Sequence, residues 1–146
     1  MTGFDILAGH ASAEQVAEHF TLCDSSFVPP LSDRVNITDY ARKVTTFALC
    51  IEGWHNASLM GLLCMYCDDV DKGAFITNVS VIPAFRRKGV ANLLISHAIE
   101  KVREKGISKI NLEVDNANEP AQCLYRRLGF SPNLVTQQTT MMLINL

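Results

Sequence analysis

The spacing of apolar residues changes in the middle of this chain from a strand-like to a helical periodicity. Polar and apolar residues alternate from Asn78 to Val81, and Phe75 with Ile76 extends the β-prone run, which predicts a partly buried strand that Pro83 ends. Beyond the next turn the apolar positions recur every three or four residues, at Val90, Ala91, Leu94, Ile95, Ala98, Ile99 and Val102. This second pattern predicts an amphipathic helix that ends at Gly106, a residue suited to a left-handed C-cap.

The same patterns predict further elements on both sides of this unit. Helices are expected over residues 12–23, 39–43 and 118–128, with Ser12, Thr38 and Asn118 as their N-caps. Strands are expected over residues 46–52, 58–67, 109–114 and 136–145, with a turn at residues 53–56. Residues 27–35 are expected to form an ordered loop, because two consecutive prolines exclude regular helix there.

The order of these elements predicts a mixed α/β fold. Strand, helix and strand across residues 74–114 are expected to form a right-handed parallel crossover, and the strands before it an antiparallel meander. The chain of 146 residues suits one domain, residues 1–146, and leaves no room for a second.

Composition and charge argue against several functions. Apolar residues make up 48% and charged residues 19%, and no apolar run approaches the length of about 20 residues that a membrane helix needs. The net charge of -2 gives no attraction to nucleic acid or to an anionic membrane. No secretory signal follows Met1, so we expect a cytoplasmic protein. The five cysteines suit no metal site and are expected to be reduced, buried thiols.

A basic turn with a glycine leads from the central strand into the helix. It contains Arg86, Arg87, Lys88 and Gly89. The first N–H groups of a helix lack internal partners, the helix dipole is positive there, and glycine permits close approach to the backbone. We therefore expect this turn to bind a phosphate or pyrophosphate. The glycine spacings of nucleotide-triphosphate loops and of dinucleotide-binding turns are both absent from the sequence.

Two segments resemble the GCN5-related N-acetyltransferase (GNAT) family. The turn Arg86-x-x-Gly89-x-Ala91 is similar to the family's Arg/Gln-x-x-Gly-x-Gly/Ala turn, which binds the pyrophosphate of acetyl-coenzyme A. Residues 118–130, Asn-Glu-Pro-Ala-Gln-Cys-Leu-Tyr-Arg-Arg-Leu-Gly-Phe, resemble the family's Asn-x-x-Ala-x-x-Leu-Tyr-x-x-x-Gly-Phe segment. The two segments stand in the family's order, and the resemblance covers about residues 45–146.

This resemblance implies a splayed sheet, in which the two central parallel strands diverge, and acetyl-CoA as the cosubstrate without a metal. The main chain of Val79 and Val81 is then expected to pair with the pantetheine arm. Asn118 is expected to contact coenzyme A as well as to cap its helix. The phosphates are expected at Arg86, Arg87, Lys88, Gly89, Val90 and Ala91.

The resemblance also places Tyr125 at the position where the family carries its general acid. A phenol with a pKa of about 10 is a reasonable proton donor to a departing thiolate whose pKa is about 8.5. The alternative is that Tyr125 is a core aromatic whose hydroxyl satisfies a buried partner.

Glu113 is the candidate general base. It alternates with Leu112 and Val114 on a predicted strand, where desolvation would make it a stronger base. The Leu-Glu-Val run is similar to that of the bacterial ribosomal-protein alanine acetyltransferases, in which this glutamate serves as base. The alternatives are that Glu113 is simply solvated, or that Asn78 and Ser80 order a water molecule that relays the proton.

The sequence leaves the acetyl acceptor open. Residues 27–34 lie where the family builds acceptor specificity, and Arg34 and Tyr40 are candidates to orient an acidic or sugar-like acceptor. The alternative, favoured for each residue taken singly, is an ordinary surface position. We expect an N-acetyltransferase for an amine of a small molecule, an amino sugar or a peptide. The alternative is a catalytically silent coenzyme A binding module with a regulatory or subunit role. Nucleic-acid binding through residues 86–88 is disfavoured by the net charge, and a homodimer is expected to use the apolar strand at residues 141–144.

Overall fold

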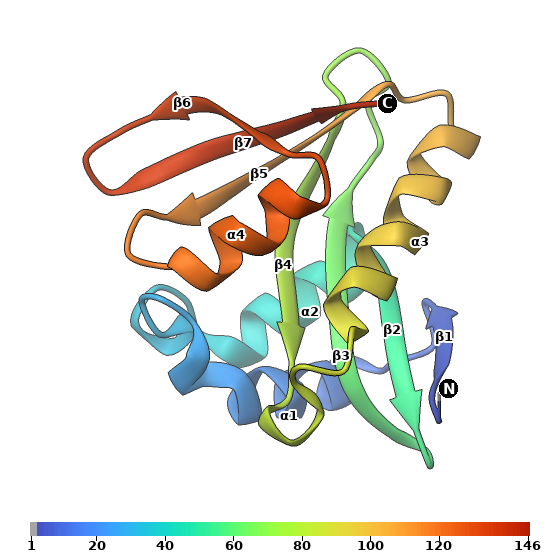
Figure 1. The fold of residues 1–146 in the computed structure, drawn as a ribbon. Coiled ribbons are helices and arrows are strands. Elements are labelled where there is room, and N and C mark those ends of the chain that lie inside the picture. Colours follow the sequence, from blue (N-terminus) through green and yellow to red (C-terminus); the bar gives the residue numbers. More distant parts are fainter. Residues whose placement is uncertain (1–2) are drawn as a thin grey trace.

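The computed structural model describes residues 3–146 and forms one sheet with helices on both faces (Figure 1). The strands are β1 (Asp5–Ala8), β2 (Leu49–His55), β3 (Ser58–Tyr66), β4 (Ala74–Val81), β5 (Lys109–Asp115), β6 (Ser131–Val135) and β7 (Thr139–Asn145). The α-helices are α1 (Ala13–Cys23), α2 (Ile37–Phe47), α3 (Val90–Glu104) and α4 (Glu119–Arg127). Short 3-10 helices cover Asp24–Ser26, Leu31–Asp33 and Pro83–Phe85. The predicted mixed α/β class is confirmed.

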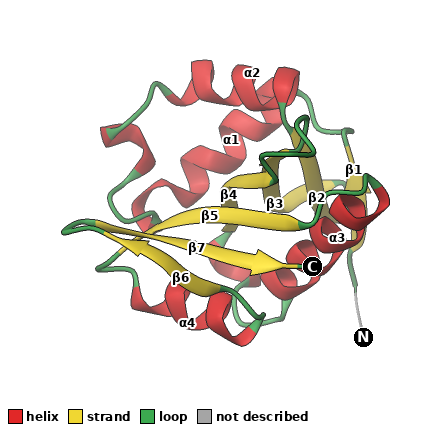
Figure 2. Cartoon of the chain, turned by 90° about the horizontal axis from the view of Figure 1, so that it is seen from above, coloured by secondary structure: helices red, strands yellow, loops and turns green. Residues whose placement is uncertain are grey.

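The sheet has the strand order β1-β2-β3-β4-β5-β7-β6. β4 and β5 are parallel, with α3 between them in the chain, and the other neighbouring strands are antiparallel. Figure 2 shows α1 and α2 on one face of the sheet and α3 and α4 on the other. The predicted parallel unit and the antiparallel strands before it are both present.

The two parallel strands are paired only at one end. Register pairs join Ala74–Ile76 of β4 to Ile110–Leu112 of β5, and beyond them the strands diverge (Figure 1). β4 remains paired with β3 as far as Val81, and β5 remains paired with β7 as far as Asp115. The expected splay is thus confirmed. A gap opens between β4 and β5, while each of these strands stays hydrogen-bonded to its other neighbour.

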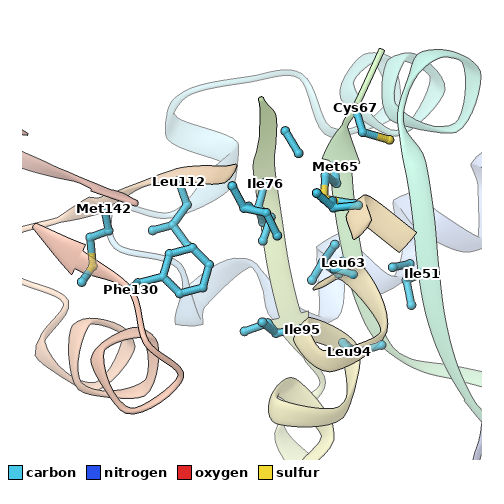
Figure 3. Close-up of a cluster of buried hydrophobic side chains, with 14 of the residues drawn as sticks. Ile51, Leu63, Met65, Cys67, Ile76, Leu94, Ile95, Leu112, Phe130 and Met142 are labelled. Atoms are coloured by element: carbon cyan, nitrogen blue, oxygen red, sulfur yellow. The ribbon is translucent and has the colours of Figure 1, made fainter. Parts of the chain in front are cut away.

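Each face of the sheet has its own core. The larger core lies under α3 and α4 and contains Leu63, Ile95 and Leu112, which Figure 3 shows among their neighbours. The smaller core lies under α1 and α2 and contains Phe20, Val44 and Leu62. None of the described helices is long and apolar enough to cross a membrane.

Three predicted helix signals are present in the structure. Ser12 accepts a hydrogen bond from the N–H of Gln15 and completes a capping box with it, and Asn118 accepts one from the N–H of Ala121. Gly106 adopts a φ of +76° after α3, as expected for a left-handed residue that ends a helix. Local side-chain chemistry therefore determines where these helices begin and end.

Several predicted boundaries are wrong. α2 begins at Ile37 under an Asn36 cap, not under Thr38, and continues to Phe47, so β2 starts at Leu49 rather than at residue 46. β2 also extends through residues 53–55, and the turn lies at residues 56–57. Packing explains the longer helix, because Ala41 and Val44 are buried against the sheet. The expected burial of all five cysteines is wrong for Cys123, which is exposed on α4.

The proposed dimer edge is also wrong. Residues 141–144 belong to β7, which is paired with β5 on one side and with β6 on the other. No free edge remains on this strand. The outer strands of the sheet are β1 and β6, and the sequence analysis identified neither of them as a separate element.

Candidate active site

A cavity of about 980 Å³ occupies the gap between β4 and β5. Its walls come from both faces of the sheet: the loop between α1 and α2, the diverging strands, the start of α4 and the β6–β7 turn. The lining residues are Phe27, Val28, Pro29, Arg34, Ile76, Thr77, Asn78, Val79, Leu112, Glu113, Val114, Asp115, Asn116, Ala117, Asn118, Ala121, Tyr125, Gln137, Gln138 and Thr139. The cavity is therefore bounded by elements from both faces of the sheet.

The two candidate catalytic residues reach this cavity from opposite faces. Leu112 and Val114 of β5 point into the core under α3 and α4, so Glu113 between them faces the side of α1 and α2. Tyr125 of α4 packs against the core on the other face. The site thus brings both residues to one space and separates them by the plane of the sheet.

The main chain of β4 is free on the side of the gap. The N–H of Ile82 donates to the carbonyl of Met60 on β3 at 2.9 Å, so the alternate residues Val79 and Val81 direct their N–H and C=O groups away from β3. The carbonyl of Val81 accepts a hydrogen bond from Nε of Arg86 at 3.0 Å. An extended ligand can therefore pair with this strand as another strand would.

The predicted anion turn stands at the start of α3. Gly89 is the N-cap residue with a φ of +79°, it makes no side-chain cap, and Arg87 adopts a φ of +62°. A Cβ atom built on Gly89 has no other heavy atom within 4 Å, so the space in front of the first turn is open. Residues 86–89 are exposed. Free amides, positive charge and open space meet here, as anion binding requires.

The position of this helix end depends on a close approach to β3. A Cβ atom built on Gly61 would lie 2.8 Å from Cγ1 of Val90 and 3.3 Å from Cδ1 of Leu94. Val90 is buried and Ala91 half-buried. Val90 therefore packs its side chain inward, and the backbone N–H groups of both residues lie in the first turn of the helix.

The hydroxyl of Tyr125 takes part in none of the hydrogen bonds among residues 3–146. Its ring meets that of Phe130 edge-on, with 5.9 Å between the centroids. Burial raises the pKa of Tyr125 to about 12, so the phenol keeps its proton at neutral pH. The alternative role of Tyr125 required its hydroxyl to bond to a buried polar group, and the described residues provide no such partner.

Glu113 is exposed, and the hydroxyl of Thr139 donates to its Oε2 at 2.8 Å. The desolvation expected for this carboxylate is not observed, because the divergence of β4 opens its side of the strand to solvent. Next to it, Asp115 accepts a hydrogen bond from the N–H of Ala117 at 2.8 Å. Asp115 thus bonds to the main chain of the turn that follows it, whereas Glu113 does not.

A buried polar chain lies beside the cavity, and it joins Asn78 and Ser80 to His19, which no sequence pattern had singled out. The hydroxyl of Ser80 donates to Oδ1 of Asn78 at 2.9 Å and lies 2.9 Å from Nε2 of His19 on α1. The proton of the Ser80 hydroxyl is therefore used in the bond to Asn78, and the water relay suggested for Asn78 and Ser80 stays a prediction. His19 lies three residues after Val16 and four before Cys23, so it falls on the buried face of α1. This spacing is the sequence signal that could have identified His19 as a buried histidine.

The two residues expected to orient the acceptor differ in position. Arg34 is exposed and lines the cavity. The hydroxyl of Tyr40 instead lies 3.1 Å from Oγ1 of Thr77, and its ring packs 5.3 Å from that of Phe20. Burial raises the pKa of Tyr40 to about 12. Tyr40 therefore supports the smaller core and does not line the cavity.

The family assignment rests on agreement between this site and known proteins. The model of the acetyltransferase (GNAT) family matches residues 13–130, which include both diverging strands, the anion turn and α4. The chain belongs to the GNAT acetyltransferase family. Among solved structures, the PaiA N-acetyltransferase of Thermoplasma acidophilum in complex with coenzyme A has the same fold, with a TM-score of 0.75, 15% identity and coverage of 97% of this chain and 99% of that chain.

Curated relatives of this GNAT protein act on chemically different acceptors. The chain is 43% identical over 56 residues to streptothricin acetyltransferase of Streptomyces lavendulae, covering 38% of this chain and 30% of that relative. It is 30% identical over 115 residues to the N-alpha-acetyltransferase MAK3 of Arabidopsis thaliana, covering 77% of this chain and 60% of that relative. The chain thus spans less than two thirds of the length of the relatives it matches.

Proposed function

We propose that this protein transfers the acetyl group of acetyl-CoA directly to an amine. The observation that carries the proposal is the cavity in the splayed sheet, which has the free main chain of β4 on one wall and the open anion turn beyond it. Membership of the GNAT family supports the same activity.

The cosubstrate is proposed to bind along β4 and across the start of α3. The pantetheine arm pairs with the main chain of Val79 and Val81, and the pyrophosphate accepts hydrogen bonds from the amides of residues 89–91. Arg87 and Lys88 add positive charge, whereas Arg86 also holds the turn to the carbonyl of Val81. Asn118 at the start of α4 lines the cavity and completes the contacts. Such remote binding fixes the thioester next to the amine, which removes much of the entropic barrier.

The chemistry requires one group to accept a proton and another to supply one. Glu113, directly or through a water, takes a proton from the ammonium form of the acceptor, and the neutral nitrogen attacks the thioester carbon. The C–S bond then breaks, and Tyr125 donates its proton to the departing thiolate. The acetylated nitrogen loses its second proton to water, and a proton from water returns the Tyr125 phenolate to the phenol. Burial makes the phenol a weak acid, but the same dry surroundings disfavour a bare thiolate, which brings the two groups closer in proton affinity.

The acceptor is proposed to be an amine of a small molecule, an amino sugar or a peptide, and the protein is proposed to act in the cytoplasm. A catalytically silent coenzyme A binding module is the alternative function. Release of the coenzyme A thiol in the presence of a panel of amines separates the two. Amine-dependent release supports the enzyme, whereas binding of acetyl-CoA without release with any amine supports the silent module. Absence of acetyl-CoA binding, measured by a thermal shift, overturns both.

A further inference from the structure

The buried chain of His19, Ser80 and Asn78 ends at the wall of the cavity. Asn78 is 7% exposed, and the cavity accounts for that exposure, because the residue lines it. His19 and Ser80 are 1% and 7% exposed. Burying three polar side chains carries a cost unless each is hydrogen-bonded, so the chain is a specific feature rather than a filler of the core.

The orientation of the Asn78 amide sets the proton order along this chain. A serine hydroxyl has one proton, and Ser80 gives it to Oδ1 of Asn78. Ser80 must then accept from Nε2–H of His19, 2.9 Å away, which leaves Nδ1 of His19 without a proton. Nδ1 is enclosed without a partner, and an unpaired ring nitrogen is tolerated there better than an unpaired N–H. Burial supports the neutral ring, because it lowers the pKa of His19 to about 4.

The amide nitrogen of Asn78 is consequently the end of the chain that meets the cavity. Oδ1 is occupied by Ser80, whereas Nδ2 is neither bonded to another described residue nor fully enclosed. Its two N–H groups are free donors on the wall of the gap. An oxygen of a bound molecule can accept from them, and an apolar or donor-only group cannot.

The face of the sheet identifies which bound molecule meets this amide. Asn78 and Ser80 point toward α1, the side on which Glu113 also lies. Tyr125 and the start of α3 lie with the other core, where the thioester carrier is proposed to bind. The molecule on the Asn78 side is therefore the amine acceptor.

We propose that Asn78 selects acceptors that carry a carbonyl, carboxylate or hydroxyl oxygen next to the reacting amine, by donating its amide N–H groups to that oxygen. Ser80 and His19 are positioning residues, which hold the amide in this orientation. This inference rests on the proposed acetyl transfer and narrows its acceptor class. It favours an amino acid amide or a peptide terminus, or a 2-amino alcohol, over a simple alkylamine or polyamine.

The test compares isosteric amines that differ in the oxygen. Alaninamide is paired with 3-methyl-2-butylamine, and 2-aminoethanol with propylamine, and kcat/KM is measured by thiol release. The ratio of kcat/KM within a pair is then compared between wild type and variant, so that the different basicities of the two amines cancel. Asn78→Leu is expected to lower the ratio about tenfold by raising KM for the oxygen-bearing amine. Asn78→Asp, which keeps the shape and replaces N–H by oxygen, is expected to lower it as well.

The positioning residues are tested through the same ratio. Ser80→Ala and His19→Leu are expected to lower it about threefold, since the amide loses its fixed orientation. His19→Gln retains an N–H donor and is expected to restore the wild-type ratio. Ser96→Ala is the control, because Ser96 is exposed on α3 and bonds only to the carbonyl of Asn92. Melting temperatures identify variants that do not fold, and Asn78→Asp then replaces Asn78→Leu.

Two results overturn the assignment while leaving the proposed transfer intact. One is a ratio unchanged by both Asn78 variants, and the other is a wild-type protein that uses only oxygen-free amines. Absence of thiol release with every amine is a different failure, because it overturns the acetyl transfer itself.

Discussion

Glu113 and Tyr125 face one cavity from opposite sides of the central sheet. The arrangement suits a reaction in which one proton leaves the acceptor and another reaches the departing thiol. The two steps then occur on the two sides of the thioester, and neither group has to move between them. Each residue can be tested by itself.

Tyr125→Phe is expected to lower the turnover number about a hundredfold, because the thiolate then leaves without a proton donor. The hydroxyl has no hydrogen-bond partner among the described residues, so its removal is expected to change the melting temperature little. The measurement is steady-state thiol release at saturating acetyl-CoA, with thermal melting alongside. An unchanged turnover number would remove Tyr125 from the mechanism.

Glu113→Gln is expected to lower kcat about a hundredfold at neutral pH, with little effect on the KM for acetyl-CoA. Glu100→Gln is the matched control, since Glu100 is an exposed glutamate on α3 outside the cavity. The pH profile of kcat/KM for both variants is the measurement. If Glu113→Gln keeps the wild-type rate, Glu113 is not the general base, and a water molecule that it does not position accepts the proton of the amine.

Gly89→Ala is expected to weaken acetyl-CoA binding about tenfold, because a methyl group at this cap would meet the pyrophosphate. Gly106→Ala is its control at the other end of α3. Both glycines have a left-handed φ, +79° and +76°, and neither has another heavy atom within 4 Å of an added Cβ, so both substitutions impose the same backbone strain. Binding is measured by isothermal titration. Equal loss of affinity in the two variants would show strain alone and contradict the predicted contact.

The neutral state of His19 predicts a pH dependence of stability. Burial lowers the pKa of His19 from 6.5 to about 4, so between these values the unfolded chain binds the proton and the folded protein does not. The stabilisation is therefore complete above pH 6.5 and is lost as the pH falls toward 4, by about 3 kcal/mol in all. Urea unfolding at pH 7, 5.5 and 4.5 measures it. His19→Gln is expected to show a flatter dependence than wild type, and identical slopes would refute the assignment.

The periodicity of apolar residues correctly predicted those helices and strands that bury one face against the core. The buried residues of α3 recur every three or four positions over its fifteen residues. Its predicted boundaries agree with the structure because Gly89 and Gly106 mark its two ends. β6 carries no such pattern, since all five of its residues are exposed, and β1 buries none of its four residues fully. These strands are held by main-chain pairing with their neighbours, which leaves no periodic signal in the side chains.

The site was predictable where one continuous segment forms it. The turn at residues 86–91 joins a strand to a helix, so sequence spacing alone places its amides. His19 and Ser80 meet across 61 positions, a separation that only the packing of α1 on β4 closes. Their partnership could not be read from either local pattern. The roles of Glu113 and Tyr125, the cytoplasmic location and a homodimer all stay predictions.

The open half of β4 links the sheet of this protein to its acetyl donor. Past Ile76 the strand has main-chain groups that face the cavity rather than a neighbouring strand, so they can take a hydrogen-bonding partner. A pantetheine arm laid along them would close the gap in the manner of an inserted strand. The donor would then supply the hydrogen bonds that a neighbouring strand supplies elsewhere in the sheet.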